Sequence, residues 1–209
     1  MLVAVVTGAL GIGVLVALRR GAYRRPDETG PLPRHLWVVA VAPFAGVLVA
    51  RALADHPWPA LLPYLVLVPA GLALAAIDAD VHRLPNAITL PLVPVELALL
   101  AGASAATGDW TSLRRAGLAA LLVGGGFLLL ALVLYGRSVG MGDAKLIVSL
   151  AAVLGWLSWG HVLLGLWLGF VLGGVVALGL LLARRAGRGT HLAFGPYLVV
   201  GTLVALLLG

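Results

Sequence analysis

Eight apolar segments, separated by short polar loops, account for most of this 209-residue sequence. They lie at residues 2–18, 36–54, 60–77, 87–106, 116–135, 145–158, 161–183 and 192–208. Most of them have the length of about 17–25 residues that a helix needs to cross the hydrocarbon core of a bilayer. The sixth is short and joins the seventh through a tight uncharged turn at 158–160, so the count is seven to eight. The sequence therefore predicts an all-α polytopic membrane protein.

The composition excludes a soluble globular domain. Hydrophobic residues make up 62% of the chain and charged residues only 11%, whereas soluble domains have about 45–50% and about 25%. The chain has no cysteine, which excludes disulfides, Cys-ligated zinc and a thiol nucleophile. No linker or internal repeat divides the sequence, so we expect residues 1–209 to form a single integral membrane domain.

The distribution of basic residues predicts how the chain is oriented. Of the 14 Lys and Arg residues, 11 lie in or beside the loops at 19–35, 78–86, 136–144 and 184–191. Because positive charge is retained on the cytoplasmic side, these four loops are expected to face the cytoplasm and both termini to face outside. The first segment precedes its basic residues, the reverse of a secretory signal, and is expected to stay as an anchor. The net charge of +6 is then a topology signal, and nucleic-acid binding is not predicted.

The eight acidic residues fall into two groups. Four lie in polar loops, where solvation explains them: Asp27, Glu28, Asp55 and Asp109. The other four are Asp78, Asp80, Glu96 and Asp143, and three of these sit at the predicted cytoplasmic ends of apolar segments. These four residues are the candidates for a functional site.

Asp78 and Asp143 are the strongest candidates. Asp78 closes the third segment and is followed by Pro85, which disfavours helix in the residue before it. Asp143 lies just before the sixth segment, after Gly140 and Gly142, which permit positive φ and close approach. Two carboxylates brought together at a partly desolvated interface cannot both ionise easily, so one keeps a proton while the other acts as base. This is aspartic protease chemistry; the alternative is two interfacial charges that each end a helix.

The motifs around these aspartates resemble those of a known family. The segment GMGDAK at 140–145 is similar to the GxGDxK motif of type IV prepilin peptidases, membrane-embedded aspartic proteases that remove the leader from pilin precursors. The segment IDADVHRLPNAITLPL at 77–92 resembles the family's first-aspartate motif, and FGPYLVVG at 194–201 resembles its late Phe-Gly-Pro motif. The resemblance covers the chain from about residue 60 to its end.

The resemblance implies roles for particular residues. Asp78 and Asp143 would be the catalytic pair, and the motif residues that shape or flank the site would be Gly140, Gly142, Lys145, Pro85 and Asn86. Lys145 would hold a phospholipid head group or a substrate carboxylate, or would mark the cytoplasmic edge. Asp80, two residues after the first aspartate, is the competitor for that position and a possible accessory residue. The resemblance implies no metal and no cofactor.

The implied substrate is a pilin-like precursor with a basic leader, cut after a glycine at the cytoplasmic face of the inner (plasma) membrane. Membrane lipid is the other expected partner, and no oligomeric state is predicted. Classical members carry a cytoplasmic insertion with paired CxxC motifs, and here the short loop at 19–35 stands in its place without cysteine. A zinc site of that type is excluded, which argues against N-methyltransferase activity. The chain is therefore expected to be a short, peptidase-only member.

Glu96 fits no motif of the family. It lies about ten residues into the fourth segment, roughly 15 Å of rise from its cytoplasmic end, where an ionisable group is a functional hypothesis by default. We expect a protonated acid that hydrogen-bonds between helices, with carbonyls freed by Pro91 and Pro94 as acceptors. An accessory catalytic part is the alternative.

Two other functions remain open at this point. A small proton-coupled secondary transporter could use Asp78, Asp143 and Glu96, although the carboxylates concentrate at one interface instead of the midplane. A non-catalytic scaffold could use the stripe formed by Gly165, Gly169 and Gly173, but packing within the chain is the favoured reading of that stripe.

Overall fold

The computed structural model describes residues 1–134, 140–184 and 193–209. The described residues form helices joined by short loops, which confirms the predicted all-α fold. The helices are α1 (Leu2–Arg19), α2 (Trp37–Ala52), α3 (Leu61–Val81), α4 (Asn86–Thr107), α5 (Trp110–Ala119), α6 (Gly125–Val133), α7 (Met141–Leu157), α8 (Trp159–Leu182) and α9 (Gly195–Leu208). A 3₁₀ turn, Trp58–Ala60, precedes α3, and a π segment, Ala120–Gly124, joins α5 to α6. Parts of two predicted loops, 136–139 and 185–191, lie outside the described residues.

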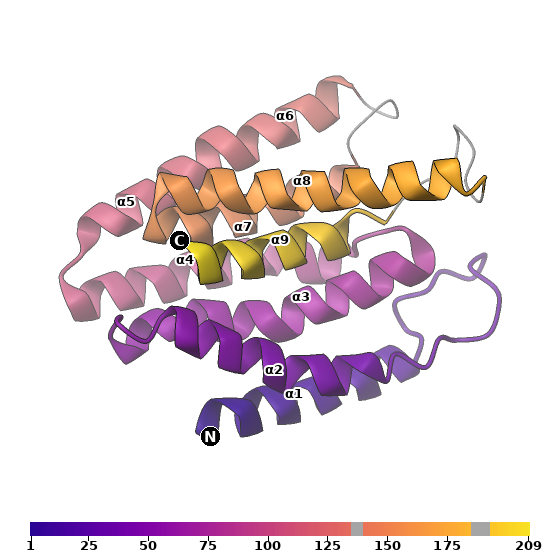
Figure 1. Cartoon of the computed structure of the whole chain (residues 1–209), viewed down its shortest axis with the longest axis horizontal. Coiled ribbons are helices and arrows are strands. Elements are labelled where there is room, and N and C mark those ends of the chain that lie inside the picture. The colour runs from indigo at the N-terminus through magenta and orange to yellow at the C-terminus, as the bar shows by residue number, and fades with distance from the viewer. Residues whose placement is uncertain (135–139, 185–192) are drawn as a thin grey trace.

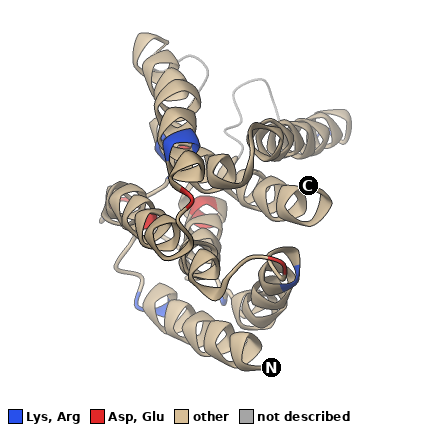
Figure 2. Cartoon of the chain, turned by 90° about the vertical axis from the view of Figure 1, so that its left-hand side faces the viewer, with Lys and Arg blue, Asp and Glu red and all other residues tan. Residues whose placement is uncertain are grey.

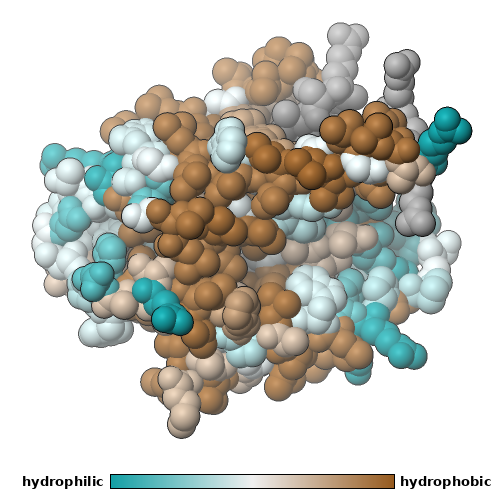
Figure 3. Space-filling view, viewed as in Figure 1, coloured by the Kyte–Doolittle hydropathy of each residue, from teal (hydrophilic) through white to brown (hydrophobic). Residues whose placement is uncertain are grey.

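The helices match the predicted apolar segments closely, and they carry a hydrophobic surface. Five described segments are long and apolar enough to span a bilayer: Leu2–Arg19, Trp58–Val81, Asn86–Thr107, Trp110–Val133 and Trp159–Leu182. Helices α2 and α9 are apolar but shorter. A broad apolar band separates polar surface at the two ends of the molecule (Figure 3). Figure 2, in which the described residues are coloured by charge, shows that charged residues occupy few positions along the helices.

The helices run roughly lengthwise, so the loops gather at two ends (Figure 1). The α1–α2 loop, the α3–α4 loop and the first residues of α7 and α9 share one end, which we call the carboxylate end. Both chain termini lie at the opposite end (Figure 1). This arrangement fits the loop grouping obtained from the basic residues, while the side of the membrane that each end faces stays a prediction.

Helix α7 lies at the centre of its half of the bundle. It contacts α4, α5, α6, α8 and α9, and most of its residues from Ala144 to Trp156 are buried. A helix that is apolar all round is suited to such a position. At its far end, the Arg115 guanidinium donates to the carbonyl oxygens of Gly155, Trp156 and Leu157, groups that a helix C-terminus otherwise leaves unpaired. Arg115 thus holds the C-terminal end of α7, the helix that carries Asp143 near its other end.

Helices α8 and α9 pack closely through glycine. A Cβ at Gly201 would lie 2.5 Å from the Gly169 nitrogen and 2.6 Å from the Gly165 oxygen. Similarly, a Cβ at Gly173 would lie 2.6 Å from the Phe194 ring. The predicted glycine stripe of α8 therefore serves packing within the chain, because only glycine lets the two backbones approach so closely. This contact carries the start of α9 to the carboxylate end.

Candidate active site

Asp78 lies in the last turn of α3, where several local features end the helix. His82 adopts a left-handed conformation, with φ of 50°, and its N–H donates to the Asp78 carbonyl oxygen at 2.8 Å. Pro85 is extended and precedes the first residue of α4. The side chain of Asp78 is buried, with the residue 4% exposed. It is therefore held on a rigid helix at the edge of the apolar core.

A backbone donor from the far end of the sequence fixes the Asp78 carboxylate. The N–H of Gly195, the first residue of α9, donates to Asp78 Oδ2 at 2.8 Å. The first N–H groups of a helix have no partner within the helix, and the helix dipole favours an acceptor there. The late Phe-Gly-Pro motif, for which the sequence alone predicts no role, thus supplies a hydrogen bond to the first aspartate.

Asp143 lies in the first turn of α7, as expected for an acidic residue near the positive end of a helix dipole. Neither glycine uses the positive φ that it permits, since Gly140 has φ of −63° and Gly142 lies within α7. Close contacts, which a Cβ atom would prevent, instead explain why glycine occupies both positions. A Cβ at Gly140 would lie 2.7 Å from Asp143 Oδ2, and one at Gly142 would lie 2.8 Å from the Leu84 Cβ. These glycines therefore make room for the carboxylate and for the α3–α4 loop.

Both aspartates line one cavity of about 490 Å³ at the carboxylate end. We call it the carboxylate pocket, and its lining residues are Arg25, Asp78, His82, Arg83, Leu84, Asn86, Gly140, Met141, Gly142, Asp143 and Lys145. The structure thus gathers most of the predicted site residues from two segments that are 65 positions apart. Two carboxyl groups that line one cavity can divide the tasks of an ionised and a protonated partner toward a water molecule.

Lys145 and Asn86 join the two halves of this pocket. The Lys145 Nζ donates to the Asn86 Oδ1 at 2.7 Å, so the start of α7 is bonded to the start of α4. Pro85, the neighbouring motif residue, does not line the carboxylate pocket but lines an adjacent groove. These contacts give Lys145 a structural partner within the chain, alongside the lipid and substrate contacts considered from the sequence.

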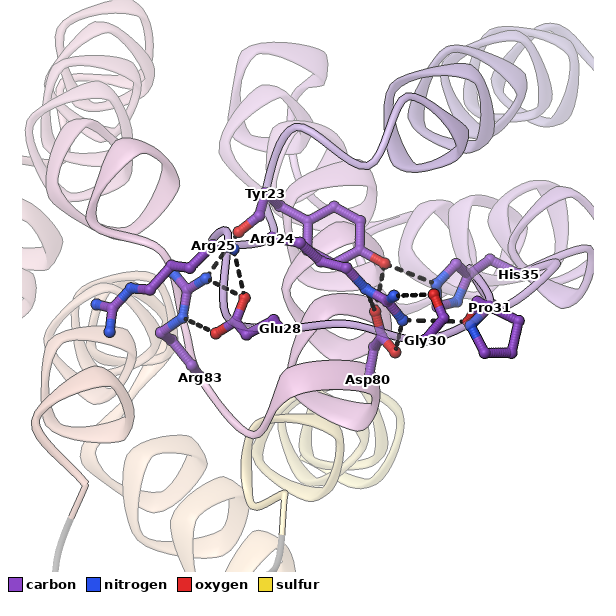
Figure 4. A network of polar contacts seen from close by, with 9 residues as sticks. All are labelled: Tyr23, Arg24, Arg25, Glu28, Gly30, Pro31, His35, Asp80 and Arg83. Atoms are coloured by element: carbon purple, nitrogen blue, oxygen red, sulfur yellow. Dashed lines mark hydrogen bonds and ion pairs between the residues drawn. The ribbon is translucent and has the colours of Figure 1, made fainter.

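Asp80, the competitor for the first catalytic position, faces a different set of partners (Figure 4). Its carboxylate accepts two hydrogen bonds from Arg24, from Nε at 2.8 Å and from Nη2 at 2.6 Å, and one from the Tyr23 hydroxyl at 2.5 Å. Burial and the Asp80 carboxylate raise the pKa of Tyr23 to about 12, so the hydroxyl stays a donor. Asp80 is not among the residues that line the carboxylate pocket. Its partners indicate that it anchors the α1–α2 loop.

Glu28 belongs to the same network, contrary to the expectation of a solvated loop charge. Its carboxylate accepts from Arg83 Nε at 3.0 Å and from Arg83 Nη2 at 2.8 Å, as well as from the Arg25 backbone N–H (Figure 4). The hydrogen bond from Arg83 lowers the pKa of Glu28. The pairing joins residues 55 positions apart, and no local pattern in the sequence indicates it. The α1–α2 loop is therefore bonded to both sides of the turn that follows Asp78.

Glu96 is fully buried in α4, and the structure does not bring it to the carboxylate pocket. Neither of its carboxyl oxygens has a hydrogen-bond partner among the described residues, so the expected bond between helices is absent. Pro91 and Pro94 leave the carbonyls of Ala87 and Leu90 without helical donors. Both of those residues are exposed, whereas Glu96 faces the interior. The freed carbonyls therefore lie on the exposed side of α4, away from the Glu96 carboxyl group.

The described residues contain no group of three or more His, Asp or Glu side chains that could hold a metal ion. The fold and the site together define a polytopic helical membrane protein with two aspartates in one pocket at its loop-bearing end. Residues 65–183 match the type IV leader peptidase family, and the chain belongs to this family.

The curated relatives carry the name prepilin leader peptidase/N-methyltransferase. The protein of Aeromonas hydrophila is 33% identical over 177 residues, which cover 84% of this chain and 59% of the relative. The proteins of Pseudomonas aeruginosa and Pseudomonas putida are 36% and 37% identical over 141 and 155 residues, covering 66% and 69% of this chain and 46% and 50% of the relatives. The chain thus spans about half of the length of these relatives. No solved structure shows a significant match.

Proposed function

We propose that this protein is a membrane-embedded aspartic endopeptidase that removes the basic leader from a type IV pilin-like precursor. The observation that carries the proposal is the convergence of Asp78 and Asp143 on one pocket. Membership of the type IV leader peptidase family supports the reaction, and the names of the relatives support the kind of substrate. The excess of basic residues in the loops of the carboxylate end supports a cytoplasmic active site.

The chemistry needs one ionised and one protonated carboxyl group. The ionised group accepts a proton from a water molecule, whose oxygen attacks the carbonyl carbon of the scissile peptide bond. The protonated group gives its proton to the carbonyl oxygen, and a tetrahedral diol forms. When the C–N bond breaks, the leaving nitrogen takes a proton from the carboxyl group that gained one. A diol hydroxyl returns its proton to the carboxylate that had given one, which restores the starting pair, and the acid and amine products leave without a covalent intermediate. The Gly195 N–H holds Asp78 in place throughout.

Cleavage in membranes tests the proposal directly. The protein is co-expressed with a pilin-like precursor that has a basic leader, a glycine and an apolar segment, and loss of the leader is followed by gel shift. Asp78→Asn and Asp143→Asn are each expected to abolish the shift, because each removes one member of the pair. Asp80→Asn is the matched control: it keeps the chemistry, and its amide can still accept from Arg24, so most cleavage should remain.

Survival of cleavage in either variant of the pair would refute the assignment. A proton-coupled transporter that uses the same carboxylates would leave the precursor intact even with the unchanged protein. The relatives' names also include N-methyltransferase. We propose only the peptidase activity for this chain, which lacks the cysteines of the family's insertion. Mass spectrometry of the new N-terminus of the product would show a methyl group if that proposal is wrong.

A further inference from the structure

A second cavity adjoins the carboxylate pocket. It has a volume of about 620 Å³ and runs between α1 and α4, with α3 beneath. Four residues line both cavities: Arg25, Arg83, Leu84 and Asn86. We call this cavity the α1–α4 groove. An occupant of this groove therefore lies next to the pocket that the two aspartates line.

The groove has room because small side chains form much of its wall. Ala17 of α1, Ala73 of α3 and Ala87 at the start of α4 all line it. Ala17 and Ala87 are exposed, so the groove opens at the surface of the bundle. Its volume lies in the range of about 300–1,000 Å³ that is usual for ligand sites.

The polarity of the groove changes along its length. The part away from the carboxylate pocket is apolar and includes Val14 and Leu18 of α1 and Ile77 of α3, whereas Arg25 and Arg83 lie where the groove meets that pocket. From Val14 to Leu18 the helix rises about 6 Å, which is the length of roughly one helical turn. A molecule that matches this groove therefore has an apolar part about one helical turn long, followed by a polar part beside the carboxylate pocket.

We propose that the α1–α4 groove binds the first apolar turn of the precursor's membrane segment, immediately after the bond that is cut. This inference rests on the proposed peptidase function and adds the place where the enzyme recognises the apolar side of the cleavage site. The segment enters sideways from the bilayer between α1 and α4. Its polar end then lies over Asp78 and Asp143, so the start of the apolar turn determines which bond is cut.

A phospholipid is the other molecule with this polarity. The cations beside the carboxylate pocket that could hold a lipid phosphate are Arg25 and Arg83, and Arg83 is already paired with Glu28 through two hydrogen bonds. The groove also adjoins the carboxylate pocket, which suits a substrate whose scissile bond must reach Asp78 and Asp143. These observations favour the precursor, and the experiment below includes lipid binding as an outcome.

Filling the groove tests the proposal with two substrates. One is the membrane precursor, and the other is a peptide that has the leader and the cleavage site but ends before the apolar segment. Ala73→Leu and Ala17→Trp are expected to lower kcat/KM for the precursor by about tenfold or more, as for added bulk in an apolar subsite, and for the peptide by less than about twofold. The control is Ala177→Trp on the exposed face of α8, away from the groove, which should affect neither substrate.

A crosslinking measurement needs no turnover. A photoreactive residue at Ile88, in an Asp143→Asn background, is expected to form an adduct with the uncleaved precursor, and one at position 177 is not. An adduct with lipid alone, unchanged kinetics in both groove variants, or equal losses with precursor and peptide would each overturn the proposal. If the unchanged protein cleaves neither substrate, the peptidase function fails, while the adduct at Ile88 still reports on the groove.

Discussion

One added carbon atom can test the hydrogen bond between Gly195 and Asp78. In Gly195→Ala the new Cβ would lie 3.0 Å from Asp78 Oδ2, 3.3 Å from the Leu84 Cδ2 and 3.5 Å from the Asp78 Cβ. The carboxylate must then move by a few tenths of an ångström, which stretches the 2.8 Å bond from the Gly195 N–H. Gly195 has no positive φ, so alanine itself is not strained there. The substitution therefore acts on the orientation of Asp78.

The expected size follows from the strength of this bond. Hydrogen bonds to charged groups contribute about 1.5–3 kcal/mol, and each 1.36 kcal/mol corresponds to about tenfold in rate. Partial to complete loss of the bond should thus lower kcat/KM for the precursor by about 10- to 150-fold. The measurement is the initial rate of leader removal in membranes. Gly174→Ala is the matched control, since a Cβ there meets no atom within 4 Å, and it should cleave normally.

The result that would refute this reasoning is specific. If Gly195→Ala keeps at least half of the normal rate while Asp78→Asn abolishes cleavage, the N–H of α9 does not set the orientation of Asp78. A fall in the midpoint of thermal unfolding shared by Gly195→Ala and the control would show a general loss of stability. Equal midpoints with unequal rates are expected.

Two further substitutions test the interior of the bundle. Glu96→Gln is expected to retain full cleavage and unchanged thermal unfolding, because a neutral amide closely replaces a protonated acid; loss of cleavage would instead give Glu96 an accessory role. Gly201→Val should lower the free energy of unfolding by about 1–3 kcal/mol through overpacking, since its Cβ would meet the backbone of Gly169 and Gly165. Gly179→Val, which meets no atom within 4 Å, controls for helix propensity, and equal unfolding of both variants would contradict the predicted contact.

The helices and the site aspartates were predictable for different reasons. Apolar segments fix helix positions because a segment in lipid must pair its own backbone N–H and C=O groups within a helix. The observed bounds differ from the predicted ones by six residues at most, at Trp110. The short α7 was recognised despite Asp143 and Lys145, since the residues after them are apolar. Asp78 and Asp143 could be proposed from the sequence because few acidic residues lie at helix ends. The structure brings them to one cavity, and their catalytic role stays a proposal.

The contacts that complete the site were not predictable from local patterns. The bond from Gly195 to Asp78 spans 117 positions, and its donor is a backbone group that every residue except proline possesses. The pairing of Glu28 with Arg83 depends on how the α1–α2 loop folds over the end of α3. A loop rich in both charge signs is compatible with solvation or with pairing, and only the tertiary arrangement decides between them.

The length of α2 has a consequence for the surrounding bilayer. With 16 residues, this helix rises about 24 Å, less than the hydrocarbon thickness of about 30 Å. Such hydrophobic mismatch is relieved when the adjacent lipid leaflets draw closer together. The protein is thus expected to thin the membrane next to α2 and to work best among lipids with shorter acyl chains.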